Sequence, residues 1–327
     1  AHDHEHDAHG HVHGVVDPSI FTTQRGIWAV KWSFVGLSVT ALFQVVIFML
    51  SGSVALLADT IHNIGDAATA IPLWFAFTLA RRKPSKRFTY GYGRVEDLAG
   101  VAVVLTILFS AVVAGYQSID RLLHPQNVVY LWAVAVAALV GFIGNEAVAV
   151  FRIKVGKEIG SAALIADGHH ARVDGLTSLA VLVGAVGVWL GYPIADPVVG
   201  FLISAAILRI VWESGKAVFT RMLDGVDPEI IDEIRHAVNH APGVQDVTEV
   251  RVRWIGHRLH AEVNVAVTPD LTVEKGHDIA MEARHQLLHS MRYLSNVTIH
   301  IDAVHTSGEQ HHFIGDHSHD DFPHHSH

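Results

Sequence analysis

The sequence contains no cysteine among its 327 residues. Disulfide bonds and thiolate metal ligands are therefore excluded, so any bound metal ion must be held by nitrogen and oxygen atoms. Charged residues are also scarce, at 17% where a soluble domain carries about 25%.

The N-terminus lacks the pattern of a cleavable signal peptide. The formal net charge of -9 argues against nucleic acid as a partner.

The shortage of charge is confined to the first two thirds of the chain, which contain six long apolar segments. Each is long enough for the roughly 20 residues that cross a bilayer as a helix. We therefore expect a mainly α protein with a six-helix transmembrane domain over residues 21–222. The segments are 29–51, 54–80, 95–118, 128–152, 160–190 and 194–216.

Basic residues between the apolar segments predict the orientation of the chain. The connection after the second segment is strongly basic from Arg81 to Arg87, and Arg152, Lys154 and Lys157 follow the fourth. The first and fifth connections have no basic residue, and the third has only Arg121. Both termini are therefore expected in the cytoplasm, and the protein in a bacterial cytoplasmic membrane.

Residues 223–305 have the mixed composition of a soluble domain. Asp227-Pro228 is typical of a helix start, and we expect this helix to reach about residue 239. Alternating residues predict strands at 245–254 and 258–267, followed by a helix at 271–290 and a strand at 296–303. This α-β-β-α-β order predicts a small, ferredoxin-like α+β domain in the cytoplasm.

The two ends of the chain, residues 1–20 and 306–327, are expected to be disordered. Residues 1–14 and 305–327 together contain 14 of the 26 histidines, interleaved with Asp, Glu, Gly and Ser. We interpret the ends as metal-scavenging tails. A cloning tag or a solvated filler segment is the alternative.

The second and fifth apolar segments share the pattern A-D-x-x-H-x-x-x-D, at residues 58–66 and 166–174. A histidine and an aspartate four residues apart lie on one face of a helix. Two such helices facing each other would supply two imidazoles and two carboxylates, a set suited to tetrahedral zinc. Ionisable side chains in a bilayer are costly unless they serve a site or a pairing. The predicted ligands are His62, Asp66, His170 and Asp174, and the alternative is a polar network joining two helices.

Other polar residues in the apolar segments have more than one interpretation. Asp59 and Asp167 are candidate relay groups for protons or ions beside the site; otherwise they hydrogen-bond between helices, or Asp167 pairs with Arg172. Glu96, Asp97, Asn145 and Glu146 are interpreted as packing and cavity-lining groups rather than metal ligands.

On these motifs, the chain resembles the cation diffusion facilitator family of zinc and related divalent metal transporters. The resemblance implies a homodimer that exchanges metal for protons. It implies the same four ligands, since the family takes an x-x-x-D pair from each of two helices. It also implies an ion pair at the dimer interface between Arg94 and Asp224. A second metal site of the family, in the connection after the second segment, is expected to be absent because Phe88 and Tyr92 stand where histidines would be.

The resemblance further implies a metal site in the C-terminal domain, built from His277, His300 and Asp302. Gln245 and Asn264 occupy two positions where other ligands are expected, and His260 and Glu262 are the substitutes. Ordinary surface histidines are the alternative interpretation.

The sequence thus predicts a proton-coupled exporter of divalent cations, zinc first, with no enzymatic activity and no cofactor. Zinc would be the substrate and a candidate regulatory ligand. Co²⁺, Cd²⁺, Fe²⁺, Ni²⁺ or Mn²⁺ is the alternative main substrate. A membrane-anchored metal sensor or buffer is the alternative function. An intramembrane metalloprotease is disfavoured because the H-E-x-x-H signature is missing.

Overall fold

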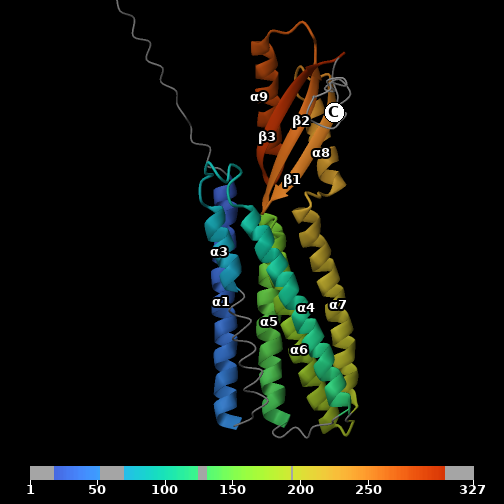
Figure 1. The fold of residues 1–327 in the computed structure, drawn as a ribbon. Coiled ribbons are helices and arrows are strands. Elements are labelled where there is room, and N and C mark those ends of the chain that lie inside the picture. Colours follow the sequence, from blue (N-terminus) through green and yellow to red (C-terminus); the bar gives the residue numbers. More distant parts are fainter. Residues whose placement is uncertain (1–17, 52–69, 124–130, 193, 306–327) are drawn as a thin grey trace, which may run out of the picture.

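A computed structural model describes residues 18–51, 70–123, 131–192 and 194–305. A bundle of long helices is followed by a small C-terminal domain at one end of the bundle (Figure 1). The bundle helices described are α1 (Pro18–Ser51), α3 (Ala70–Ala80), α4 (Arg94–Leu123), α5 (Leu131–Ile159), α6 (Ala162–Trp189) and α7 (Ala195–Met222).

Four of these helices are long and apolar enough to cross a membrane, over Thr22–Ile47, Arg94–Val113, Trp132–Ile159 and Val198–Met222. Most of the second apolar segment lies outside the described residues, and its last part forms the shorter apolar helix α3. The bundle helices mostly extend beyond the apolar segments from which they were predicted. α1 in particular begins at Pro18, inside the stretch expected to be a tail.

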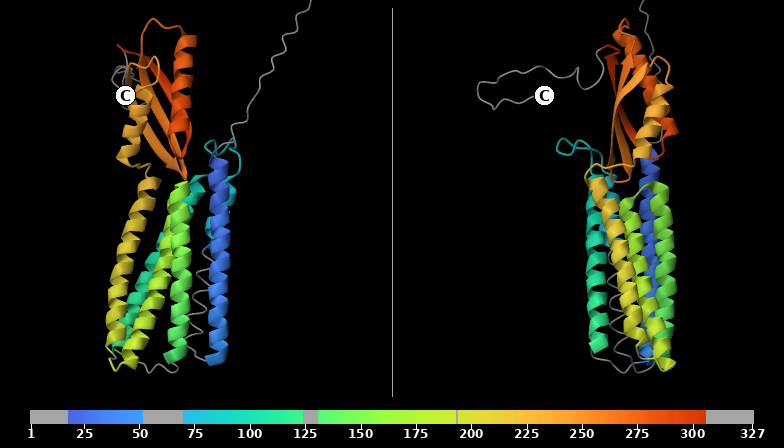
Figure 2. Two further views of the ribbon diagram at one scale, coloured as in Figure 1. Left: turned by 180° about the vertical axis from the view of Figure 1, so that it is seen from behind. Right: turned by 90° about the vertical axis from the view of Figure 1, so that its right-hand side faces the viewer.

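Helix α6 lies at the centre of the bundle, between α5, α4 and α7 (Figure 2). Ala166 and Val173 pack with residues of α4 and α7. Ala171 packs with Leu37 of α1 and Ala149 of α5. Because α6 contacts other helices on several sides, its polar residues Asp167, His170 and Asp174 are buried within the bundle.

The C-terminal domain contains α8 (Pro228–Asn239), β1 (Asp246–Ile255), β2 (Arg258–Val267), α9 (Val273–Ser290) and β3 (Leu294–Ala303). The predicted order and approximate bounds are confirmed. β2 is the central strand, antiparallel to β1 and parallel to β3. Both helices cover one face of the sheet (Figure 2), and Ile234 and Leu287 join the strands in one apolar core.

Local signals explain why these two helices begin where they do. The side chain of Asp227 accepts a hydrogen bond from the backbone N–H of Glu229, and Pro228 occupies the first turn of α8. Thr272 accepts one from the N–H of Lys275 at the start of α9. The hairpin between β1 and β2 turns at Gly256, whose φ is +64°, and points toward the bundle.

Candidate metal site

His170 and Asp174 lie one turn apart on α6, as their spacing predicts. The distance from His170 Nε2 to Asp174 Oδ2 is 3.8 Å, and their side chains are 1% and 3% exposed. Both groups are held inside the bundle by the apolar residues that pack around α6. This half of the predicted site is therefore buried, with its imidazole and its carboxylate side by side.

The other predicted half, His62 and Asp66, lies outside the described residues, as does the candidate relay Asp59. Within the described ranges, no cluster of three or more histidine or acidic side chains is placed to hold a metal ion. The described part of the predicted site thus comprises one imidazole, from His170, and one carboxylate, from Asp174.

Asp167 lies one turn before His170 and pairs with Arg152 of α5. Arg152 Nη1 is 3.0 Å from Asp167 Oδ2, and both side chains are completely buried. The alternative that Asp167 pairs with Arg172 is wrong, because Arg172 pairs with Glu146 instead. Arg172 forms two hydrogen bonds with Glu146, at 3.2 and 2.8 Å.

Two other acidic residues, Glu96 and Asp97, lie in the first turn of α4 and are 1% and 6% exposed. Glu96 accepts hydrogen bonds from Ser161 and from His257 of the C-terminal domain. Asp97 accepts one from the backbone N–H of Gly256 at 3.2 Å. Both acids have protein partners, which fits their interpretation as packing groups. Asn145 is also buried.

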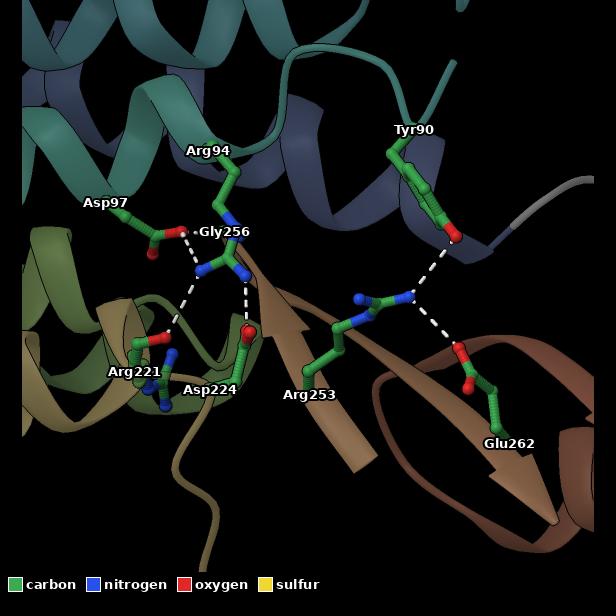
Figure 3. Close-up of polar contacts among 8 residues, drawn as sticks. All are labelled: Tyr90, Arg94, Asp97, Arg221, Asp224, Arg253, Gly256 and Glu262. Carbon is green, nitrogen blue, oxygen red and sulfur yellow. Dashed lines mark hydrogen bonds and ion pairs between the residues drawn. The ribbon is translucent and has the colours of Figure 1, made fainter. Parts of the chain in front are cut away.

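Arg94 and Asp224 form the ion pair implied by the resemblance, here within one chain (Figure 3). The pair joins the start of α4 to the segment just after α7, which ends at Met222. Arg94 also donates to the carbonyl oxygen of Arg221 at 3.3 Å and lies 3.8 Å from Asp97. Its guanidinium group therefore connects the two helices at the end of the bundle that faces the C-terminal domain.

In the basic connection between α3 and α4, the rings of Phe88 and Tyr92 lie against each other, with centroids 4.9 Å apart. Ser85 and Phe88 exchange backbone hydrogen bonds of 3.1 Å, which fold this connection into a compact turn. Phe88 and Tyr92, the two positions at which the resemblance would place histidines, thus pack against each other.

The predicted ligands of the C-terminal domain are not gathered within one chain. His300 and Asp302 lie on one strand, with Nε2 and Oδ1 3.0 Å apart, and His277 is exposed on α9. Glu262 pairs with Arg253 at 3.0 Å. Burial lowers the pKa of His260, and the neighbouring Arg253, Arg258 and Arg94 lower it further.

His257 is the residue that the sequence analysis missed. It lies at the tip of the β1–β2 hairpin, where a histidine after glycine is normally an exposed turn residue, yet its side chain is 2% exposed. The available signal was Glu96, an acid in an apolar segment that required a buried partner.

Comparisons with known proteins give two consecutive family matches. Residues 30–223 match the cation efflux transmembrane domain. Residues 226–304 match the cytoplasmic domain of cation efflux proteins.

Three relatives cover most of the chain. A probable cation efflux system protein of Mycobacterium tuberculosis is 54% identical, over 91% of this chain and 88% of the relative. The magnetosome protein MamB of Magnetospirillum gryphiswaldense is 27% identical, over 83% of this chain and 92% of MamB. The manganese efflux system protein MneP of Bacillus subtilis is 26% identical, over 78% of this chain and 88% of MneP.

Proposed function

The chain belongs to the cation efflux family, the cation diffusion facilitators, and we propose that it exports Zn²⁺ in exchange for protons. The family consists of transporters of divalent metals, so the protein moves cations and is not an enzyme. The proposed transport site comprises His62, Asp66, His170 and Asp174. His170 and Asp174 are the described half, and their geometry carries the proposal.

The separation of these two side chains supports tetrahedral coordination. Two ligands bound to one tetrahedral zinc ion, each at about 2.0–2.1 Å, are about 3.3 Å apart. The observed 3.8 Å between Nε2 and Oδ2 is within a small rotamer adjustment of that value. A hydrogen bond between the two groups would instead bring them to about 2.7–2.9 Å.

Charge supports the coupling to protons. Two carboxylates and two neutral imidazoles balance a divalent cation, which makes the occupied site tolerable in a medium of low dielectric constant. Release of the ion would leave two carboxylates close together, and proton uptake relieves their repulsion. Metal binding requires deprotonated ligands, so loss of those protons restores affinity on the other side.

The remaining proposals follow from the family and the charge pattern. The protein is a homodimer with six spans per protomer in a bacterial cytoplasmic membrane, and both termini and the C-terminal domain lie in the cytoplasm. The domains are the membrane region, which extends from the start of α1 at Pro18 to residue 222, and residues 223–305, with His-rich tails before Pro18 and at 306–327 that collect metal. Zn²⁺ is also the proposed regulatory ligand of the C-terminal domain.

The relatives leave the choice of metal open to test, since one is named for manganese efflux. Manganese prefers more oxygen ligands, whereas imidazole nitrogen suits zinc, iron, copper and nickel. Two histidines in the proposed set favour zinc over manganese for this chain. Cobalt, cadmium, iron(II) and nickel are the competing ions for the same donors.

Metal-by-metal transport into proteoliposomes tests the proposal, with His170→Ala compared to His169→Ala. The two histidines are neighbours on α6, but only His170 is aligned with Asp174. We expect zinc transport to be lost in His170→Ala and largely kept in His169→Ala. Equal loss in both variants would contradict the site, and manganese transport faster than zinc transport by the wild type would contradict the metal.

A further inference from the structure

The tip of the β1–β2 hairpin is inserted into the end of the helical bundle. The His257 ring lies 5.8 Å from the ring of Phe77 in α3. Its Nδ1 is 2.6 Å from Glu96 Oε2 in α4, and its Nε2 is 3.0 Å from Thr23 Oγ1 in α1. One side chain of the C-terminal domain therefore contacts three bundle helices while remaining 2% exposed.

The hydrogen bonds around His257 form a continuous chain that runs from α1 to the start of α6. Glu96 accepts from the Ser161 hydroxyl at 2.5 Å through its other oxygen. Ser161 directly precedes α6, and its oxygen also accepts from the backbone N–H of Leu164 at 3.1 Å. A carboxylate that accepts from Nδ1 requires the proton on that nitrogen, so in the neutral ring Thr23 donates to Nε2. Glu96 thus has two donors at positions from which water is excluded.

The backbone at the hairpin tip also fits closely against the bundle. A Cβ on Gly256 would lie 2.7 Å from the carbonyl oxygen of Gly93 and 2.9 Å from Glu96 Oε2. A Cβ on Gly93 would lie 2.8 Å from the carbonyl oxygen of Ile255. Two glycines in contact, one with a φ of +64°, allow an approach that no other residue pair would permit.

Charged residues flank the inserted tip on the solvent side (Figure 3). Arg253 of β1 donates to the Tyr90 hydroxyl at 3.3 Å and pairs with Glu262. On the other flank, Arg94 connects α4 to the end of α7. These contacts are partly exposed and salt-sensitive, whereas the His257 network is buried.

From this geometry we propose that His257 is a positioning residue for cation transport. It holds the ends of α1, α4 and α6 in register through Thr23, Glu96 and Ser161. α6 carries His170 and Asp174, so the C-terminal domain fixes the helix that supplies half of the transport site. The inference rests on divalent-cation efflux by the family and is independent of zinc as the preferred metal.

Transport kinetics distinguish positioning from ligand binding. Zn²⁺ uptake is measured in proteoliposomes for His257→Ala, His257→Gln and the matched control His236→Ala, an exposed histidine on α8. We expect His257→Ala to lower the maximal rate at least about fivefold, the lower end of couplings between distant sites. The apparent KM for Zn²⁺ should stay within about twofold if the ligands are intact. Glutamine, which can still bond to Glu96, should recover part of the rate, and His236→Ala should match the wild type.

Hydrogen exchange gives a readout that does not depend on transport or on the identity of the metal. In the full-length protein in nanodiscs, His257→Ala should raise exchange at residues 93–97 and 256–258 and near Ser161, and His236→Ala should not. If liposomes that contain the wild-type protein transported no zinc, the proposal that zinc is the substrate would fail. The hydrogen-exchange test of the network would remain valid.

Two results would overturn the proposal. The first is a His257→Ala protein that exchanges and transports like the wild type. The second is a change confined to KM, which would place His257 on the ion pathway instead. Should His257→Ala fail to fold, Thr23→Val removes one bond of the network with little change in volume. If Thr23→Val changed neither the maximal transport rate nor hydrogen exchange, that result would also contradict the positioning role of His257.

Discussion

Arg152 and Asp167 form a fully buried ion pair between α5 and α6, one helical turn from His170. Arg152 Nη1 also lies 3.4 Å from the carbonyl oxygen of Asp167 and donates to it. The close approach of the two helices depends on Gly168, where a Cβ would lie 2.7 Å from Ile153 Cγ1. The pair therefore fixes α6 against α5 directly beside the proposed transport site.

Removing only the cation of this pair should destabilise the bundle strongly. Arg152→Leu leaves the Asp167 carboxylate buried without its counter-charge, which typically costs about 3–5 kcal/mol. We expect the double variant Arg152→Leu/Asp167→Leu to regain most of that loss, since an apolar pair carries no desolvation penalty. Reversible unfolding in mixed micelles measures the free energy of unfolding of the single and the double variant. The control is Arg209→Leu, which removes an exposed ion pair with Glu213.

The same pair tests the relay hypothesis for Asp167. If the carboxylate serves to hold α5 and α6 together, Asp167→Asn should slow zinc uptake without changing the number of protons exchanged per ion. A proton relay predicts the opposite, a changed ratio. A proton ratio that fell in Asp167→Asn would show that the structural interpretation is incomplete.

The sequence predicts this molecule best where a pattern repeats locally. The His170–Asp174 alignment needed only the spacing of a helix, and the strands of the C-terminal domain followed from alternation. The partners of Asp167 and Glu96 could not be derived in this way. Arg152 lies 15 residues from Asp167 and His257 lies 161 residues from Glu96, and such contacts depend on how helices and domains pack. An isolated acid in an apolar segment indicates that a partner exists but does not identify it.

Asp224, two residues after the end of α7, offers a test of backbone strain against an exposed ion pair. Asp224 has a φ of +60° and pairs with Arg94, with its side chain 49% exposed. Ala in this left-handed conformation costs about 1 kcal/mol more than Gly. Because an exposed pair contributes little, we expect Asp224→Gly to be at least as stable as the wild type, and the backbone strain should make Asp224→Ala less stable than Asp224→Gly. Thermal unfolding should rank the three proteins, and a wild type more stable than Asp224→Gly would show that the ion pair outweighs the backbone strain.

Zinc binding by the C-terminal domain can be separated from binding at the transport site. In an Asp174→Asn background, the His-rich tails should bind part of the residual zinc, and His300 and Asp302, which are 3.0 Å apart, should bind a further part. We expect His300→Ala to lower the zinc bound per chain in that background, and His289→Ala, an exposed histidine of α9, to leave it unchanged. Equilibrium dialysis of the full-length protein measures both. Identical zinc content in the three proteins would favour ordinary surface histidines.

Coupling to protons makes the sharpest prediction for the proposed function. If protons replace the metal at Asp174 and its neighbours, an acidic liposome lumen should accelerate zinc uptake, because protons leaving the lumen drive the ion inward. An ionophore that collapses the pH difference should remove the acceleration without removing downhill transport. Asp174→Asn removes one of the two carboxylates that would exchange metal for protons, so any residual uptake in this variant should respond less to the gradient than wild-type uptake does. Wild-type transport that ignored the imposed gradient would contradict coupling, while zinc efflux itself would still stand.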